Sequence, residues 1–298
     1  MIVDEPLRVG LVGAGSWARN VHAPGLADHP ATRLSAVFTR RAEAGRELAQ
    51  PYDAEVCAGL DELLGQVDAV AFAVPPAAQA ELATEAAKAG KHVILEKPIA
   101  ADVAGAERLA GAVSEAGVAS LVMLTLRYAT ATRDWLADLA AAGGWSGGAV
   151  RWLSGGLLGG PYASSPWRQV DGNTPSDVGA HAFDLLDAAL GTIERVRSAQ
   201  RGPSDLWHVV FEHEGGALSS ATLSMRLPMR PSVVEFAVYG EHGYRTLGRK
   251  EGAAGQSYTA LLDDFAAMID TGTTSHPCDV HRGLHLQRLL EAAQSLAV

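Results

Sequence analysis

An apolar segment that leads straight into a glycine-rich turn constrains the fold of this chain most strongly. Leu7–Val12 is short and apolar, as a strand buried on both faces is. The turn after it comprises Gly13, Ala14, Gly15, Ser16 and Trp17. Gly13 permits a tight turn, Gly15 lets the backbone approach a pyrophosphate, and Ala18 lets the next helix pack close to the strand. Since a helix N-terminus offers free N–H groups to phosphates, the segment predicts a dinucleotide-binding site.

Residues 1–125 alternate apolar segments with segments of helical periodicity. This alternation is typical of β-α-β units and predicts a parallel sheet. The expected strands are Leu7–Val12, Leu34–Thr39, Ala69–Val74, His92–Leu95 and Ala119–Leu124. Helices are expected before Gly90 and Gly117, which are suited to end them. We therefore predict an N-terminal Rossmann domain over residues 1–125.

Residues 126–298 have a different pattern, in which strand-like segments are joined by short turns. The expected strands are Ala149–Leu153, Val196–Gln200, Trp207–Glu212, Ala217–Met225, Val233–Tyr239 and Tyr244–Leu247. Residues 213–216 and 240–243 are typical of hairpin connections. Helices are expected over Ser176–Leu190, Tyr258–Asp270 and Val280–Leu296. The chain is thus predicted to be an α/β protein whose N-terminal Rossmann parallel sheet precedes a C-terminal α+β domain with a mostly antiparallel, mixed sheet.

Charge and composition exclude several classes of partner. The 298 residues include 24 Lys and Arg against 34 Asp and Glu, a net charge of −10 that repels nucleic acid. The longest charge-free stretches contain Gly, Pro and Ser, and Met1–Arg8 lacks a secretory pattern. Cys57 and Cys278 are too few for a disulfide framework and lack zinc-site spacing. We expect a cytoplasmic protein that binds neither nucleic acid nor a membrane nor a metal ion.

The end of the second expected strand bears on the choice of dinucleotide. An NAD-binding protein usually has an acidic residue there, which binds the ribose 2′-hydroxyl. This chain has Thr39, Arg40 and Arg41 instead, and guanidinium groups bind phosphates through paired hydrogen bonds. The pattern favours NADP, with NAD possible. The alternative is that both arginines lie in a solvated turn before the next helix.

A charged pair and a proline follow the fourth expected strand directly. Glu96, Lys97 and Pro98 lie at the carboxyl end of His92–Leu95, which is where open α/β sheets bind ligands. Pro98 restricts Lys97 to an extended conformation and so sets the direction of its side chain. These residues make Lys97 a functional candidate. The alternative is a surface Glu-Lys pair that ends a strand.

Three ionisable residues share one face of an otherwise apolar helical segment. Asp177, His181 and Asp184 are spaced i, i+4 and i+7. A single histidine on an apolar helix is usually a structural residue, but three ionisable groups are costly to bury without a purpose. The stripe therefore either faces a cleft or is paired internally.

Several motifs together resemble the Gfo/Idh/MocA oxidoreductase family. They are Gly13-Ala14-Gly15, Val74-Pro75-Pro76, Gly90-Lys91-His92-Val93, Glu96-Lys97-Pro98 and the run Asp177-x-Gly179-x-His181-x-x-Asp184. The resemblance implies a Rossmann domain followed by a mixed-sheet domain, with Val74, Pro75 and Pro76 near the nicotinamide end of the cofactor. It also implies that Lys97, Asp177 and His181 meet at an active site, and that the protein is a homodimer or larger.

Two positions depart from the family pattern. The family often has a histidine three residues after the Pro-Pro pair, where this chain has Gln79, so no role is carried to that position. The approach to the second motif, residues 172–176, is also less rich in glycine than is common in the family. This second departure bears on the shape of the substrate pocket more than on the chemistry.

The resemblance and the residues together predict an NAD(P)-dependent dehydrogenase of a small polyol, sugar or similar molecule. His181, whose ordinary pKa lies near ~6.5, is expected to exchange a proton with the substrate hydroxyl, and Lys97 to stabilise the alkoxide. Asp177 would orient the substrate or the imidazole. Weaker candidates for substrate contacts are Arg127, Tyr128, Trp167 and Arg168, whereas His22 is expected to be a packing residue. The alternatives are a non-catalytic cofactor-binding sensor and an NAD-dependent glycosidase.

Overall fold

The computed structural model describes residues 5–160, 162–248 and 254–297, so part of the N-terminal segment Met1–Arg8 lies outside the described residues. The chain divides into two compact units. Residues 1–128 and 253–285 form the first, which we call the Rossmann unit, and residues 129–252 and 286–298 form the second, the sheet unit. The domain boundary expected after residue 125 stays a prediction.

The Rossmann unit is built on a six-stranded sheet whose strands are all parallel, in the order β3-β2-β1-β4-β5-β6. Its strands are β1 (Leu7–Val12), β2 (Thr32–Phe38), β3 (Glu55–Cys57), β4 (Ala69–Phe72), β5 (His92–Leu95) and β6 (Ser120–Val122). This confirms the predicted Rossmann parallel sheet. The sequence did not reveal β3, because it has only three residues and begins with the exposed Glu55.

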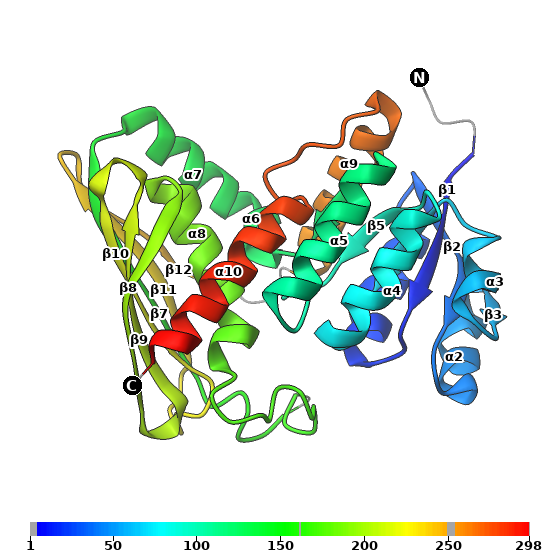
Figure 1. Ribbon diagram of the computed structural model, residues 1–298, viewed down its shortest axis with the longest axis horizontal. Helices are drawn as coiled ribbons and strands as arrows, with labels where there is room; N and C mark the ends of the chain where they lie inside the picture. Colours follow the sequence, from blue (N-terminus) through cyan, green and yellow to red (C-terminus); the bar gives the residue numbers. More distant parts are fainter. Residues whose placement is uncertain (1–4, 161, 249–253, 298) are drawn as a thin grey trace. The chain divides into compact units, whose positions relative to one another are not determined.

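Helices connect these parallel strands or come after β6 in the chain, and the last of them belongs to the sheet unit from residue 286 on (Figure 1). They are the π-helix η1 (Ala18–His22), α1 (Ala23–Asp28), α2 (Ala42–Ala49), the 3-10 turn η2 (Gln50–Tyr52), α3 (Leu60–Leu64), α4 (Pro76–Lys88), α5 (Val103–Ala116), α6 (Thr125–Tyr128), α9 (Ala254–Thr271) and α10 (Val280–Leu296). As predicted, Gly90 lies just past α4 and Gly117 ends α5, both with positive φ. The Asp102 side chain accepts a hydrogen bond from the Gly105 N–H and caps the start of α5.

The sheet unit contains a second six-stranded sheet, in the order β12-β11-β7-β10-β9-β8. Its strands are β7 (Trp145–Leu153), β8 (Ile193–Gly202), β9 (Leu206–His213), β10 (Leu218–Ser224), β11 (Val233–Gly240) and β12 (Gly243–Gly248). β7 and β10 pair in parallel and the other neighbours are antiparallel, which confirms the predicted mixed sheet. The expected hairpins join β9 to β10 and β11 to β12.

One face of this second sheet is covered by α8 (Ala180–Leu190), which packs on β7, β10 and β11. Phe183 of α8 meets Phe211 of β9 edge to face, with ring centroids 4.7 Å apart. The unit also contains α7 (Thr130–Ala142) and the short 3-10 turns η4 (Pro203–Asp205) and η5 (Glu214–Gly216). The opposite face carries cross-strand ion pairs, among them Arg151 with Glu235 at 2.8 Å.

The α-helix expected from Ser176 was wrong in its first turn. Residues Pro175–Gly179 form a π-helix, η3, and the α-helix begins only at Ala180. Pro175 lies in the first turn, where its missing N–H costs no helical hydrogen bond, whereas a Cβ at Gly179 would lie 2.9 Å from the Leu290 side chain of α10. Close packing at Gly179 is therefore the constraint on this turn. The i, i+4, i+7 spacing therefore spans two helix types.

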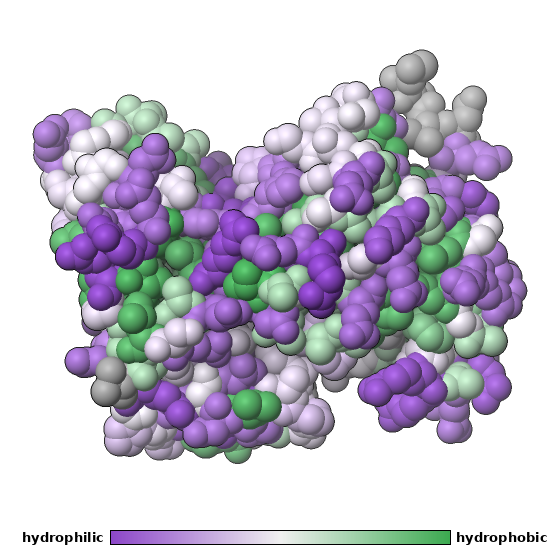
Figure 2. Space-filling model, in the orientation of Figure 1, coloured by the Kyte–Doolittle hydropathy of each residue, from purple (hydrophilic) through white to green (hydrophobic). Residues whose placement is uncertain are grey.

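No helix among the described residues is long and apolar enough to cross a membrane. Figure 2 shows hydrophilic side chains over much of the visible face, with smaller hydrophobic areas between them. The exposed large hydrophobic residues include Leu218, Tyr239 and Tyr244, which lie on β10, β11 and β12.

Candidate functional site

The glycine turn after β1 has the shape that the sequence predicts. Gly13 has a φ of +115°, and a Cβ there would lie 2.4 Å from the carbonyl oxygen of Ala73. Gly15 is exposed, and a Cβ there would meet no atom within 4 Å. Ala18 is fully buried at the start of η1. The turn is therefore closely packed on the sheet at Gly13 and open at Gly15, as the approach of a pyrophosphate requires.

The end of β2 presents two cationic side chains. Arg40 and Arg41 are exposed, and neither guanidinium makes a hydrogen bond or ion pair with any residue of the described part of the chain. Thr39 beside them is half-buried. The first acidic residue after β2 is Glu43, in the first turn of α2. This edge of the sheet therefore carries two uncompensated positive charges.

A buried glutamine holds the backbone on both sides of Lys97. The Gln79 Nε2 donates to the carbonyl oxygens of Glu96 at 2.7 Å and Ile99 at 3.1 Å, and its Oε1 accepts the Glu96 N–H at 2.8 Å. Gln79 has no exposed surface, and Lys97 is half-buried. The sequence analysis gave Gln79 no role, and the structure shows that it secures the segment that carries the candidate lysine.

The proline pair places this glutamine. Pro75 is exposed and Pro76 begins α4, and the carbonyl oxygen of Pro75 accepts the N–H of Gln79. Val74 lies beside the glycine turn, since a Cβ at Gly13 would be 3.1 Å from its Cγ1. The Val74-Pro75-Pro76 segment is therefore next to the open turn within the Rossmann unit.

The carboxylate of Glu96 is held by two further side chains. Its Oε1 accepts the indole N–H of Trp17 at 2.6 Å and lies 2.9 Å from Nε2 of His22. Nδ1 of His22 lies 3.0 Å from the hydroxyl of Tyr258, a residue 236 positions away in the chain. His22 and Tyr258 are fully buried. Sequence reasoning gave His22 only a packing role and missed Tyr258, because no local pattern connects η1 to α9.

The ionisable stripe of the second motif is buried in the sheet unit. Asp177 and His181 are 5% and 6% exposed, and Asp184 is fully buried. The imidazole of His181 stacks on the indole of Trp152, with centroids 5.9 Å apart and planes 15° apart. All three groups are therefore buried, and the choice between a stripe that faces a cleft and one that is paired internally stays a prediction.

Two of the weaker candidates gather around Asp177. Nε of Arg168 donates to Oδ1 of Asp177 at 3.1 Å. The guanidinium carbon of Arg168 lies 4.4 Å from the ring centroid of Trp167 and 4.6 Å from that of Tyr162. Nδ2 of Asn173 donates to the carbonyl oxygen of Trp167 at 2.6 Å and ties down this loop. The structure therefore brings Trp167, Arg168 and Asp177 together within the sheet unit.

Arg127 and Tyr128 belong to α6 of the Rossmann unit. Arg127 is half-buried, and the buried ring of Tyr128 lies parallel to the imidazole of His276 with centroids 6.4 Å apart. Across the described residues, no group of three or more His, Cys, Asp or Glu side chains is placed to hold a metal ion.

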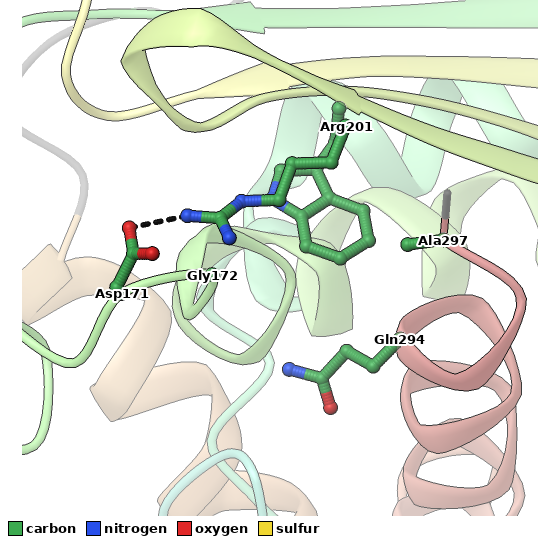
Figure 3. A pocket seen from close by; sticks show the side chains of 6 residues that line it. Asp171, Gly172, Arg201, Gln294 and Ala297 are labelled. Carbon is green, nitrogen blue, oxygen red and sulfur yellow. Dashed lines mark hydrogen bonds and ion pairs between the residues drawn. The ribbon is translucent and has the colours of Figure 1, made fainter.

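A buried carboxylate anchors the approach to η3. Asp205 accepts hydrogen bonds from the Thr174 N–H at 3.0 Å, from Nε1 of Trp207 at 2.8 Å and from Nε of Arg201 at 2.8 Å. Arg201 also pairs with Asp171, so the loop before η3 is tied to the sheet at two points. Figure 3 shows this pair beside a cavity of about 450 Å³, lined by Asp171, Gly172, Arg201, Trp207, Gln294 and Ala297.

The charge state of Asp205 follows from these contacts. Burial by itself would raise the pKa of its carboxyl group, but the three donated hydrogen bonds outweigh burial and lower that pKa below its usual range. Asp205 adopts a φ of +50°, which is uncommon for a residue other than glycine. No motif marks this residue, so sequence reasoning missed it.

A family model matches the Rossmann part of the chain. The model of the GFO_IDH_MocA family, described as an oxidoreductase family with an NAD-binding Rossmann fold, matches residues 7–124. This match agrees with the resemblance to the family that the sequence motifs indicated.

Part of the chain is similar in sequence to a named reductase. Over 201 residues it is 33% identical to dTDP-3,4-didehydro-2,6-dideoxy-alpha-D-glucose 3-reductase of Streptomyces violaceoruber, a match that covers 65% of this chain and 57% of that protein. The chain thus spans little more than half the length of this reductase.

Solved structures share the fold over nearly the whole chain. GenD2 from gentamicin A biosynthesis, crystallised in complex with NAD, has a TM-score of 0.83 and 23% identity, covering 98% of this chain and 94% of its own. A myo-inositol dehydrogenase from Corynebacterium glutamicum ATCC 13032 has a TM-score of 0.84 and 19% identity, covering 98% and 97%. At these identities the likeness concerns the fold.

Replacing the anchoring carboxylate tests its role. We expect Asp205→Asn to lower the free energy of unfolding at pH 7 by about 2–3 kcal/mol, because an amide cannot accept all three hydrogen bonds or neutralise Arg201. The lowered pKa means that the carboxylate stabilises the fold above its ordinary pKa, ~3.9, and that this contribution disappears as the pH falls through the folded value.

The measurement is urea unfolding of wild type and Asp205→Asn at pH 7 and at successive values below about pH 4. The difference between their free energies of unfolding should shrink as the pH falls. Asp171→Asn, at the exposed partner of the same arginine, is the control and should have little effect. Equal free energies of unfolding for wild type and Asp205→Asn at pH 7, or a difference that does not change with pH, would contradict the role given to Asp205.

Proposed function

We propose that this protein is an NAD(P)-dependent oxidoreductase that transfers a hydride between a nicotinamide and a hydroxyl or carbonyl carbon of a small polyol, sugar or similar molecule. The observation that carries the proposal is the segment Glu96-Lys97-Pro98, secured by Gln79 at the carboxyl end of β5. The same sheet leads from β1 into a turn that is open at Gly15. Ligands of open parallel sheets bind at this edge.

The protein's own residues would handle the proton while the nicotinamide carries the hydride. In oxidation, His181 takes the proton from the substrate hydroxyl, and the ammonium group of Lys97 donates a hydrogen bond to the developing alkoxide. In reduction the same groups act in reverse. A histidine suits this exchange because its ordinary pKa lies near ~6.5. The proposal draws Lys97 from the Rossmann unit and His181 from the sheet unit.

Asp177 would orient the substrate or the imidazole, and the ion pair with Arg168 supports this role. The pair fixes the direction of the carboxylate, and the two rings beside the guanidinium restrict its position. Arg168 and Trp167 are proposed substrate contacts on this basis. Arg127 and Tyr128 remain proposed contacts from the Rossmann unit.

The uncompensated charges at the end of β2 favour NADP over NAD. Arg40 and Arg41 have donors to offer to a 2′-phosphate, and Thr39 adds a hydroxyl. The family description names NAD, and GenD2 was crystallised with NAD, so the preference for the phosphorylated cofactor is a property that we propose for this chain.

We also propose a homodimer or larger homo-oligomer in the cytoplasm. The support for assembly is the row formed by Leu218, Gly147, Tyr239 and Tyr244 on adjacent strands, since three of these side chains are large and about half exposed. The cytoplasmic location remains an expectation from the sequence.

Turnover assays with matched variants test the reaction. With NADP or NAD and a panel of polyols, aldoses and sugar acids, wild type should release reduced cofactor, and His181→Ala should lower kcat by about 10²–10⁴-fold. Lys97→Met should cause a loss of similar size. Controls are His208→Ala on β9 and Lys88→Met at the end of α4, both exposed. Normal turnover by either site variant, or sugar cleavage without net reduction of the cofactor, would contradict the assignment.

Cofactor choice is tested by fluorescence titration with NADPH and NADH. Wild type should bind NADPH more tightly than NADH. The double variant Arg40→Ala/Arg41→Ala should weaken NADPH binding by about tenfold or more, because the loss of even one charge-assisted contact to the 2′-phosphate has an effect of that size. Its affinity for NADH should stay within about twofold, because NADH has no 2′-phosphate. Arg46→Ala on α2, the helix that follows Arg41, is the control. Tighter binding of NADH by wild type would overturn the preference.

A further inference from the structure

A chain of buried and partly buried hydrogen bonds connects three segments of the Rossmann unit. Trp17 follows the turn, His22 ends η1, Glu96 follows β5 and Tyr258 lies in α9. Trp17 and His22 both meet the same oxygen of Glu96, at 2.6 and 2.9 Å, and Tyr258 lies 3.0 Å from the other ring nitrogen of His22. The side chain of Glu96 is 15% exposed, whereas the imidazole of His22 is fully enclosed.

The chemistry of these groups fixes the direction of each hydrogen bond for a neutral imidazole. A carboxylate only accepts, so Nε2 of His22 carries the proton and donates to Glu96. Nδ1 is then an acceptor, and the hydroxyl of Tyr258 donates to it. Burial, with a smaller effect of the negative charge of Glu96, raises the pKa of Tyr258 well above its usual value, so the hydroxyl keeps its proton.

The backbone and the side chain of Glu96 are held by separate residues. Gln79 bonds the backbone N–H and carbonyl of Glu96. Among the described residues, only Trp17 and His22 bond its carboxylate. Loss of His22 would therefore leave the carboxylate held by Trp17 alone, while Gln79 still holds the backbone of Glu96.

We propose that His22 is a positioning residue for the cofactor site, which acts through Glu96. By donating to Oε1, it fixes the carboxylate next to Lys97 and keeps that oxygen in place for the indole of Trp17, directly after the glycine turn. Tyr258 orients His22 in turn. The proposal rests on the proposed binding of a nicotinamide dinucleotide at this turn, and it adds residues that no motif of the chain identifies.

The test measures NADPH and NADH dissociation constants by fluorescence, together with the melting temperature. His22→Leu should raise the dissociation constant of the preferred nucleotide by about tenfold or more, as loss of one hydrogen bond to a charged group predicts. His22→Gln keeps an N–H donor and should restore binding to within about threefold of wild type. Tyr258→Phe removes only the hydroxyl and should weaken binding by an intermediate factor.

His29→Leu is the matched control. His29 is another buried histidine of the Rossmann unit, and it meets Asp263 of α9 at 3.1 Å. This variant should lower the melting temperature as His22→Leu does but leave the dissociation constants within about twofold of wild type. The readout thus separates positioning from a general loss of stability.

A variant cycle with Glu96→Ala tests the route of the effect, because alanine removes the carboxylate that accepts from His22 and Trp17. If His22 acts through Glu96, then His22→Leu and Tyr258→Phe should each change the dissociation constant little in the Glu96→Ala background. Tyr258→Phe keeps the test available should His22→Leu not fold. Wild-type affinity in both single variants, equal losses in the Glu96→Ala background, or an equal loss in His29→Leu would each overturn the assignment. Wild type that binds neither nucleotide would refute the proposed function, and this assignment with it.

Discussion

The hydrogen bonds between Gln79 and the backbone of Glu96 are the constraint on which the candidate site of the Rossmann unit depends. The buried amide of Gln79 bonds the N–H and the carbonyl of Glu96 and the carbonyl of Ile99. These bonds fix the backbone conformation from the end of β5 through Lys97 and Pro98. A buried amide with both ends satisfied is costly to displace. The position of Lys97 relative to the glycine turn follows from this clamp and from the parallel register of β1, β4 and β5.

In the sheet unit, charged side chains fix the residues of the second motif as Gln79 fixes the segment of Lys97. Asp205 holds the N–H of Thr174 at the start of the second motif, and Arg168 holds the carboxylate of Asp177. Asp205 also pairs with Arg201, and the carboxylates of Asp177 and Asp205 are both buried. Hydrogen-bonded charges that are removed from water restrict geometry more than exposed pairs do. In each unit, residues of the motifs carry the proposed chemistry and buried polar residues outside the motifs fix their orientation.

The sequence was sufficient for the features that depend on local pattern. β1, β5 and α10 have the predicted bounds, because short continuous apolar runs mark the two buried strands and α10 is a long segment free of Pro. It was insufficient where packing decides. β3 is too short to show a pattern, and the π-helix η3 breaks the uniform spacing that was assumed for Asp177 and His181. The contact of His22 with Tyr258 joins residues far apart in the chain, and no local signal predicts such a pair.

The central claim is that the protein moves a hydride to and from a substrate carbon, with His181 handling the proton. The most direct test is reduction of a panel of keto sugars with NADPH deuterated at the transferring position of C4, followed by mass spectrometry of the product. The account predicts one non-exchangeable deuterium on the carbon that gains the hydroxyl, in amounts that depend on His181. A product that carries no deuterium from the cofactor, or cleavage of a sugar that leaves the labelled cofactor unchanged, would contradict it.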